Sequence, residues 1–177
     1  MENKKMITNV YDFASMAVTA VLIVGIIFTF VFKISTVSGQ SMENTLHHGD
    51  QLIMKSIPGE IKNGDIVVVS QPNGYDKILI KRVIAVGGQT IEIDAKNDCV
   101  LVDGKVIDEP YIKESMDFLF WGTKKYEVPE GKLFLMGDNR NNSADSRDIR
   151  IGLVDEKYVL SKVFYRIGDK TLLNSEY

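Results

Sequence analysis

The segment Lys77-Ile-Leu-Ile-Lys-Arg-Val-Ile-Ala-Val86 places two basic residues in the middle of an otherwise apolar run. Branched apolar residues at this density, followed directly by two glycines, predict a β-strand over most of the segment. Successive residues of a strand face opposite sides, so we expect Lys81 to share one side with Leu79, Val83 and Ala85. A lysine held against apolar neighbours loses hydration, and this favours its neutral form.

Short runs of the same kind recur on both sides of this segment. They are separated by turn-forming pairs such as Pro58-Gly59 and Asn73-Gly74. Asp103-Gly104, between two further apolar runs, predicts a hairpin with a type I′ turn. The sequence therefore predicts a mainly β domain, barrel-like and built from antiparallel strands. The expected strands are Gln51–Lys55, Ile66–Val69, Ile78–Val86, Thr90–Ile93, Lys132–Met136 and Tyr158–Ile167.

The N-terminal part of the chain follows a different pattern. Residues 13–32 form a run of twenty residues without one charge, and a helix of that length measures roughly 30 Å, the thickness of a bilayer core. A cleaved signal peptide is the alternative, but its apolar region has only about 7–15 residues. We therefore expect residues 1–12 to be a short cytoplasmic N-terminus, 13–32 a single transmembrane anchor and 33–177 an extracytoplasmic β domain. Two lysines near the N-terminus favour this orientation.

The composition argues against several classes of function. The net charge of -3 and the pI near 5.4 do not suit a nucleic-acid-binding protein, which needs a clustered basic face. Cys99 is the single cysteine, so an intramolecular disulfide cannot form. His47 and His48 are adjacent and lack the spacing of helical zinc ligands. The loop that begins at Asp138 lacks the glycine and glutamate of an EF-hand. We expect no metal and no cofactor.

Two side chains are candidates for nucleophilic chemistry. Ser41 lies in a turn-rich segment a few residues after the predicted anchor, and an ordinary surface serine is the simpler interpretation of it alone. Lys81 could likewise extend from its strand to water. If it stays buried and neutral instead, its amine can take a proton from a serine hydroxyl. The polar loop after the strand Lys132–Met136 adds hydroxyl, amide and charged groups, with Asp145 able to pair with Arg147.

Taken together, these segments resemble the successive sequence boxes of the bacterial type I signal peptidases. The resemblance runs from about Ser38 to about Gly168, in the family's order, after an N-terminal anchor. Its most specific parts are Lys81-Arg-Val-Ile-Ala-Val-Gly-Gly88 and Gly137-Asp-Asn-Arg-Asn-Asn-Ser-Ala-Asp-Ser-Arg147. It implies a β catalytic domain of the signal-peptidase type. It also implies a membrane-bound serine endopeptidase that removes N-terminal signal peptides from exported preproteins.

The resemblance also implies a role for individual residues. Ser41 is the expected nucleophile, and Lys81 is the general base of a Ser–Lys dyad. Ser143 is expected to orient the lysine amine. Asp145 and Arg147 are expected to brace the site as an ion pair.

Two further positions concern the substrate. Met42, beside the nucleophile, is expected to line the substrate pocket. Gly39 stands where some relatives carry a serine that helps to bind the oxyanion, so the backbone N–H of Ser41 becomes the expected main donor. The implied partners are the signal peptides of preproteins and the lipid bilayer, with no nucleic acid and no prediction of oligomeric state.

Other classes of protein fit this sequence less well. LexA-like self-cleaving repressors use a related dyad but need a DNA-binding domain or a soluble arm before it. The microsomal relatives have histidine in place of Lys81. His47 and His48 are expected to point away from Ser41, so a histidine base is not expected. A catalytically inert, membrane-anchored β domain that binds peptides is the alternative from another class, and the full set of polar site residues argues against it.

The segment Phe118-Leu-Phe-Trp121 places four large apolar residues in a row. It fits a strand buried on both faces, or an exposed lip that dips into the membrane beside the site with Trp121 at the interface.

Overall fold

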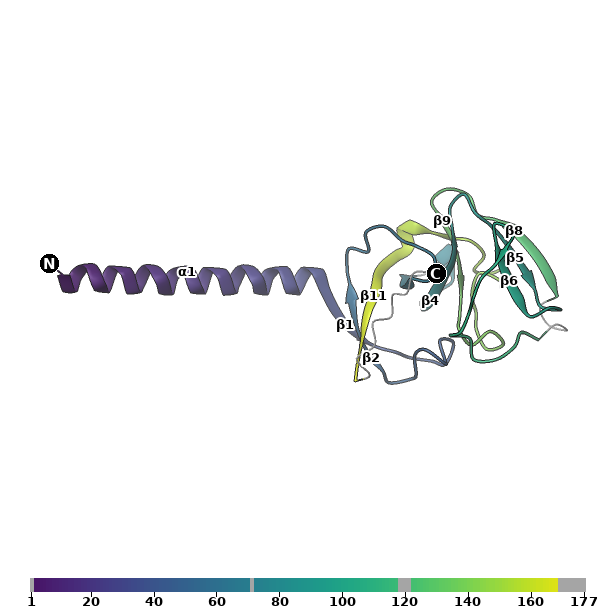
Figure 1. The fold of residues 1–177 in the computed structure, drawn as a ribbon, viewed down its shortest axis with the longest axis horizontal. Helices are drawn as coiled ribbons and strands as arrows, with labels where there is room; N and C mark the ends of the chain where they lie inside the picture. Colours follow the sequence, from purple (N-terminus) through teal and green to yellow (C-terminus); the bar gives the residue numbers. More distant parts are fainter. Residues whose placement is uncertain (1, 71, 118–121, 169–177) are drawn as a thin grey trace.

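One long helix projects from a β body (Figure 1). The computed structural model describes residues 2–70, 72–117 and 122–168. The helix, α1, comprises Glu2–Val31. Its part Met6–Val31 has a mean hydropathy of 2.5 in its most apolar window, and none of that window is buried against the β body. By length and composition alone, this helix can cross a bilayer.

The run 13–32 that predicts an anchor lies within α1 except for its last residue. Phe32 is the first residue of a strand, and the helix begins earlier than the run, at Glu2. The segment Phe118–Trp121 lies outside the described residues.

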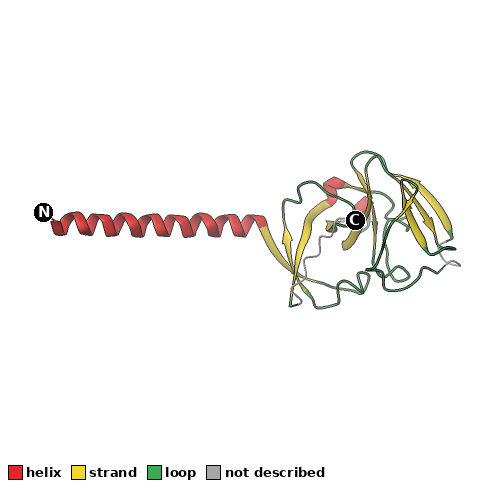
Figure 2. Cartoon of the chain, viewed as in Figure 1, coloured by secondary structure: helices red, strands yellow, loops and turns green. Residues whose placement is uncertain are grey.

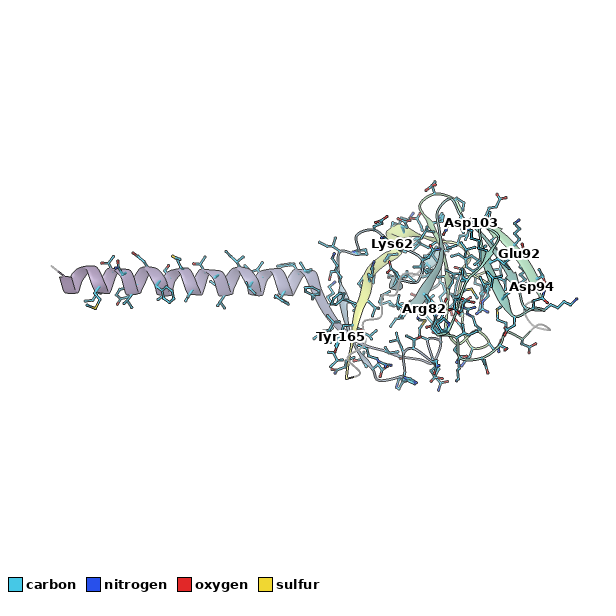
Figure 3. The ribbon with its side chains drawn as sticks, viewed as in Figure 1. Lys62, Arg82, Glu92, Asp94, Asp103 and Tyr165 are labelled. Carbon is cyan, nitrogen blue, oxygen red and sulfur yellow. The ribbon has the colours of Figure 1, made fainter. Side chains whose placement is uncertain are left out.

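The β body contains two antiparallel sheets, drawn as yellow arrows in Figure 2. The seven-stranded sheet has the order β1-β2-β11-β3-β4-β9-β10, and the four-stranded sheet has the order β7-β6-β5-β8. The four-stranded sheet lies at the end of the body farthest from α1 (Figure 1). In Figure 3, Tyr165 lies at the end of the body that joins α1, whereas Glu92 and Asp94 lie at the opposite end.

The bounds of the strands and short helices are as follows. The larger sheet contains β1 (Phe32–Thr36), β2 (Gln51–Lys55), β3 (Ile66–Ser70), β4 (Ile78–Val86), β9 (Lys132–Met136), β10 (Val154–Asp155) and β11 (Val159–Ile167). The smaller sheet contains β5 (Thr90–Asp94), β6 (Cys99–Val102), β7 (Lys105–Val106) and β8 (Thr123–Glu127). Two 3₁₀ helices, η1 (Pro72–Gly74) and η2 (Glu156–Tyr158), lie in connections.

Strand β4 lies between β3 and β9 and contributes to more than one apolar cluster. Leu79 and Val83 pack in a cluster with residues of β3 and β9. Ile84 and Ala85 pack in another cluster that joins β4 and β9 to the smaller sheet. The prediction that Ala85 shares a side with Lys81 is therefore wrong. The register opposite β9 shifts between Val83 and Ala85, and such a bulge interrupts the alternation of sides.

The six predicted strands are present, each with its ends within one residue of the predicted ends. The type I′ turn is also confirmed, because Asp103 and Gly104 both have positive φ, 51° and 76°. Three strands were not predicted, namely β1, β8 and the two-residue β10. The residues of β1 continue the apolar N-terminal run, and β8 carries Lys124 and Lys125 on an exposed sheet edge, where charge replaces the apolar pattern.

Candidate active site

Ser41 lies in a turn between β1 and β2, and the loop after β9 holds the backbone of this turn. The Asn139 N–H donates to the carbonyl of Ser41 at 3.0 Å, and the Asn139 side-chain amide donates to the carbonyl of Gln40 at 3.0 Å. Met42 and Leu46 are buried in an apolar cluster, which anchors the turn to the body. The loop after β9 and the apolar cluster therefore hold the backbone of the turn, while the Ser41 hydroxyl lies at the edge of a groove.

Lys81 is buried beside this hydroxyl. Its side-chain nitrogen Nζ lies 2.6 Å from the Ser41 Oγ, within hydrogen-bond distance, and only 2% of its surface is exposed. Burial lowers the pKa of the Lys81 amine from 10.5 to about 8, because the charged form loses its hydration. The charges of Asp145 and Asp138 raise this pKa, and the charge of Arg147 lowers it. Ser41 and Lys81, which the sequence analysis expects to act together, are thus adjacent in the structure.

An ion pair between Asp145 and Arg147 lies behind the amine. The Arg147 nitrogens Nε and Nη2 each donate to the Asp145 carboxylate at 2.8 Å, and both side chains are fully buried. The Gly137 N–H also donates to this carboxylate, at 3.0 Å. Burial alone would raise the pKa of Asp145, but Arg147 and the Gly137 N–H hold that pKa below its ordinary value. The Asp145 carboxylate therefore stays charged and forms an ion pair with the Arg147 guanidinium.

A second buried ion pair lies on the other side of β4. Arg82, the neighbour of Lys81, donates through Nε and Nη2 to the two Asp138 carboxylate oxygens at 2.9 and 2.8 Å. The Thr45 hydroxyl, from the nucleophile turn, donates to the same carboxylate at 2.5 Å. Neither Arg82 nor Asp138 was assigned to the site from the sequence. The available signal was the arginine itself, because a guanidinium inside an apolar strand needs a counter-charge.

Ser143 lies close to the site but does not bond to the lysine amine. Among the described residues its buried hydroxyl has no hydrogen-bond partner of ordinary geometry, although it is near enough to the Asp145 carboxylate to help lower its pKa. Gly137 separates Ser143 from the Ser41 backbone. A methyl group on Gly137 would overlap both the Ser143 side chain and the Ser41 carbonyl, so only glycine allows this close approach.

The dyad opens into a groove of about 280 Å³. Met42, Val68 and Ile80 give it apolar walls, and Gly39 lies on its rim with a φ of 115°. A larger cavity of about 570 Å³ is lined by Val83, Ile84 and Tyr111 among others, but it contains neither Ser41 nor Lys81. The groove is therefore the space in which a substrate can reach the hydroxyl. Within the described part of the chain, no three His, Cys, Asp or Glu side chains are grouped to hold a metal ion.

His48 contacts Gly39 at the rim of the groove. Its ring nitrogen Nδ1 accepts a hydrogen bond from the Gly39 N–H at 3.3 Å, but His48 is not among the residues that line the groove. The chain turns at Gly49, whose φ is 94°, and the Gly49 N–H donates to the carbonyl of Val37 at 3.0 Å. The Ser41 hydroxyl bonds to Lys81 and not to this ring. His47 instead lies beside Asp50.

The arrangement can activate a hydroxyl for attack on a carbonyl. A neutral amine accepts the proton of the serine hydroxyl, and the resulting alkoxide attacks the electrophilic carbon. The groove beside it has both apolar and polar walls and gives a carbonyl group access to this hydroxyl.

The chain was compared with known proteins. The family model described as "Signal peptidase, peptidase S26" matches residues 10–167. Signal peptidase I S of Bacillus subtilis (strain 168) is 34% identical over 98% of this chain and 98% of its own length. Signal peptidase IB of Staphylococcus aureus (strain N315) is 35% identical over 83% of both chains. A crystal structure of a signal peptidase I from Enterococcus faecalis V583 matches with a TM-score of 0.50 at 24% identity, covering 59% of this chain and 97% of that one. The predicted fold, an apolar helix followed by an antiparallel β domain of this type, is confirmed.

The buried ion pair can be tested against an exposed one of the same spacing. Asp145→Asn leaves the buried Arg147 without a counter-charge, so the free energy of unfolding should fall by about 3–5 kcal/mol. Asp148→Asn breaks the Asp148–Arg150 pair, whose arginine is 68% exposed, and should cost less than about 1 kcal/mol. Denaturant unfolding in detergent measures both values. Equal losses would show that Asp145 does not support the site as described.

Proposed function

Because this chain belongs to the signal peptidase I family, peptidase S26, and so cleaves signal peptides from preproteins, we propose that it does so with a Ser41–Lys81 dyad. The observation that carries the proposal is the 2.6 Å contact between the Ser41 Oγ and a lysine amine that is almost fully buried. A general base must lie within hydrogen-bond reach of the proton it takes and must be unprotonated at the working pH. Lys81 meets the first condition, and burial moves its pKa toward the second.

Acylation begins with the neutral amine of Lys81. The amine takes the Ser41 hydroxyl proton as the oxygen forms a bond to the carbonyl carbon at the cleavage site. The carbonyl oxygen becomes an oxyanion, and we assign its stabilisation to the backbone N–H of Ser41, since Gly39 offers no side-chain donor. The Lys81 ammonium then gives its proton to the departing amine, which is the new N-terminus of the mature protein. The signal peptide stays attached to Ser41 as an ester.

Deacylation repeats these steps with water. Lys81, neutral again, takes a proton from a water molecule that attacks the ester carbon. The tetrahedral intermediate collapses, Ser41 recovers its proton from Lys81, and the signal peptide leaves as a carboxylate. One amine thus serves as base and acid in both halves of the reaction.

The remaining site residues act around this dyad. Asp145 and Arg147 hold the loop that covers the amine, and Ser143 supplies a hydroxyl that can turn toward the lysine during the reaction. Met42 and Ile80 wall the groove that receives the residues next to the cleaved bond.

The position of the groove supports a site at the membrane surface. Ser35 and Thr36 line the groove, and they belong to β1, which follows α1 directly. We assign α1 as a membrane anchor that contacts the bilayer, with the N-terminus cytoplasmic and the β body extracytoplasmic. The lysines at positions 4 and 5 favour this orientation, and a preprotein emerging from the bilayer would meet the groove there.

Cleavage of a preprotein in detergent tests the dyad. Ser41→Ala removes the nucleophile and Lys81→Ala removes the base, so each should lower the rate by about 10³-fold or more. Lys124→Ala, on the exposed edge strand β8, is the matched control and should cleave like the wild type. A wild-type protein that binds signal peptides without cutting them would support the inert peptide-binding domain instead.

The pH dependence of kcat/KM tests the protonation state of the base. Below a pH of about 8 the Lys81 amine carries a proton and cannot accept another, so the rate should fall by about tenfold for each further pH unit. Above that pH the rate should level off. The profile is measured on a short signal-peptide substrate. A limb at about pH 6.5, the ordinary range of histidine, that disappears in His48→Ala would contradict the lysine assignment.

A further inference from the structure

The contacts that hold the site continue beyond the two ion pairs into the segment after β7. We propose that Glu109 and Tyr111 are positioning residues for the dyad, acting through Arg140 and Arg82. This inference rests on the proposed function, because the dyad is what they would position.

Glu109 binds the guanidinium of Arg140 in a buried, two-pronged ion pair. Arg140 donates through Nη1 and Nη2 to the two Glu109 carboxylate oxygens, at 2.9 and 2.5 Å. The Arg140 side chain is fully buried, and that of Glu109 is 8% exposed. The Arg140 Nε donates to the carbonyl of Gly137 at 3.2 Å, and Arg147 donates to the carbonyl of Arg140 at 2.7 Å. Glu109 therefore fixes the arginine that spans the base of the loop carrying Asp145.

Tyr111 connects Glu109 to the other ion pair. Its hydroxyl donates to the Glu109 carboxylate at 2.8 Å, and its ring lies under the guanidinium of Arg82 at 3.9 Å from ring centre to Cζ. A guanidinium stacked on an aromatic face is attracted by the ring and restricted in direction. Arg82 in turn binds Asp138, which accepts the Thr45 hydroxyl of the nucleophile turn. A continuous path of contacts thus joins Glu109 to the turn that holds Ser41.

The same segment also touches the nucleophile turn and the Asp138 backbone. The Lys113 N–H donates to the carbonyl of Asp138 at 3.0 Å, and the Lys113 amine pairs with Glu43 at 2.7 Å. Figure 3 shows Arg82 in the interior of the body, between Tyr165 at the α1 end and Glu92 at the end formed by the smaller sheet. The segment 107–117 is therefore the link by which the smaller sheet supports the dyad.

The position of the Asp138 carboxylate affects the dyad, because this carboxylate and the Lys81 amine interact by charge. The Asp138 carboxylate draws the amine toward its protonated form, and Arg82 both neutralises that carboxylate and fixes its place. If the Tyr111 ring no longer restrains Arg82, Asp138 and Thr45 gain freedom, and the Ser41 oxygen spends less time aligned with the amine. Small losses of alignment lower the rate of the chemical step without weakening substrate binding.

Tyr111 can be changed without leaving a sealed void in the core. Its ring borders the cavity of about 570 Å³, so a smaller side chain there extends an existing space that opens to solvent. Tyr111→Leu should therefore fold, and Tyr111→Phe keeps the ring over Arg82 while it removes the hydroxyl.

The experiment measures kcat and KM for signal-peptide cleavage per folded enzyme, in the full chain in detergent. Tyr111→Leu should lower kcat about tenfold at an unchanged KM, the pattern of lost alignment in the transition state. Tyr111→Phe should restore kcat to within about threefold of wild type, because the stack on the guanidinium remains. The matched control is Tyr75→Leu, which removes a tyrosine ring 5.8 Å from Arg150. Tyr75 does not line the groove, and its loss should leave kcat unchanged.

Each outcome decides the proposal. A wild-type kcat in Tyr111→Leu, or an equal loss in Tyr111→Leu and Tyr75→Leu, overturns it. Should Tyr111→Leu fail to fold, Glu109→Gln gives the same test, since it weakens the hold on Arg140 and should lower kcat at constant KM. If Ser41→Ala and Lys81→Ala still cleave, the dyad itself is wrong. If both are inactive while the Tyr111 and Glu109 variants behave like wild type, only this inference fails.

Discussion

The structure depends on keeping one lysine amine out of water and in contact with one serine hydroxyl. Burial lowers the pKa of Lys81 to about 8, but two carboxylates lie near enough to reverse this effect. Asp145 and Asp138 are each bound to an arginine, Arg147 and Arg82. Because their charge is largely neutralised in this way, desolvation remains the dominant influence on the amine. The two arginines thus hold the loop in shape and also limit the charge that the lysine experiences.

The fold brings these groups together from three parts of the chain. Strand β4 carries Lys81 and Arg82 on opposite sides, so one strand serves both the amine and the second ion pair. The turn with Ser41 is anchored by an apolar cluster that includes residues of β2 and β3. The loop after β9 supplies Asp138 and the residues up to Arg147. Since β1 follows α1 directly, the same sheet that carries the site is tied to the apolar helix.

Much of this could be predicted from the sequence, and the exceptions have physical causes. The strand over 78–86 follows from its branched apolar residues, and the two reactive side chains from the family resemblance. The bulge after Val83 could not be predicted, because it depends on how β4 pairs with β9. Strand β8 was missed because its exposed lysines hide the strand pattern. The partners of Arg82 and Arg140 come from distant segments, and a single sequence does not specify which carboxylate meets which guanidinium.

The central claim is that the Lys81 amine of the resting protein titrates far below an ordinary lysine. Its titration can be followed directly by NMR in detergent, with lysine labelled with ¹³C at the carbon next to the amine, and with Lys81→Arg to identify the signal. The account predicts that this one signal titrates with a midpoint near pH 8, whereas exposed lysines titrate at about 10.4. A Lys81 midpoint at or above about 10 would contradict the account, because the amine would then be charged at the pH at which it must accept a proton.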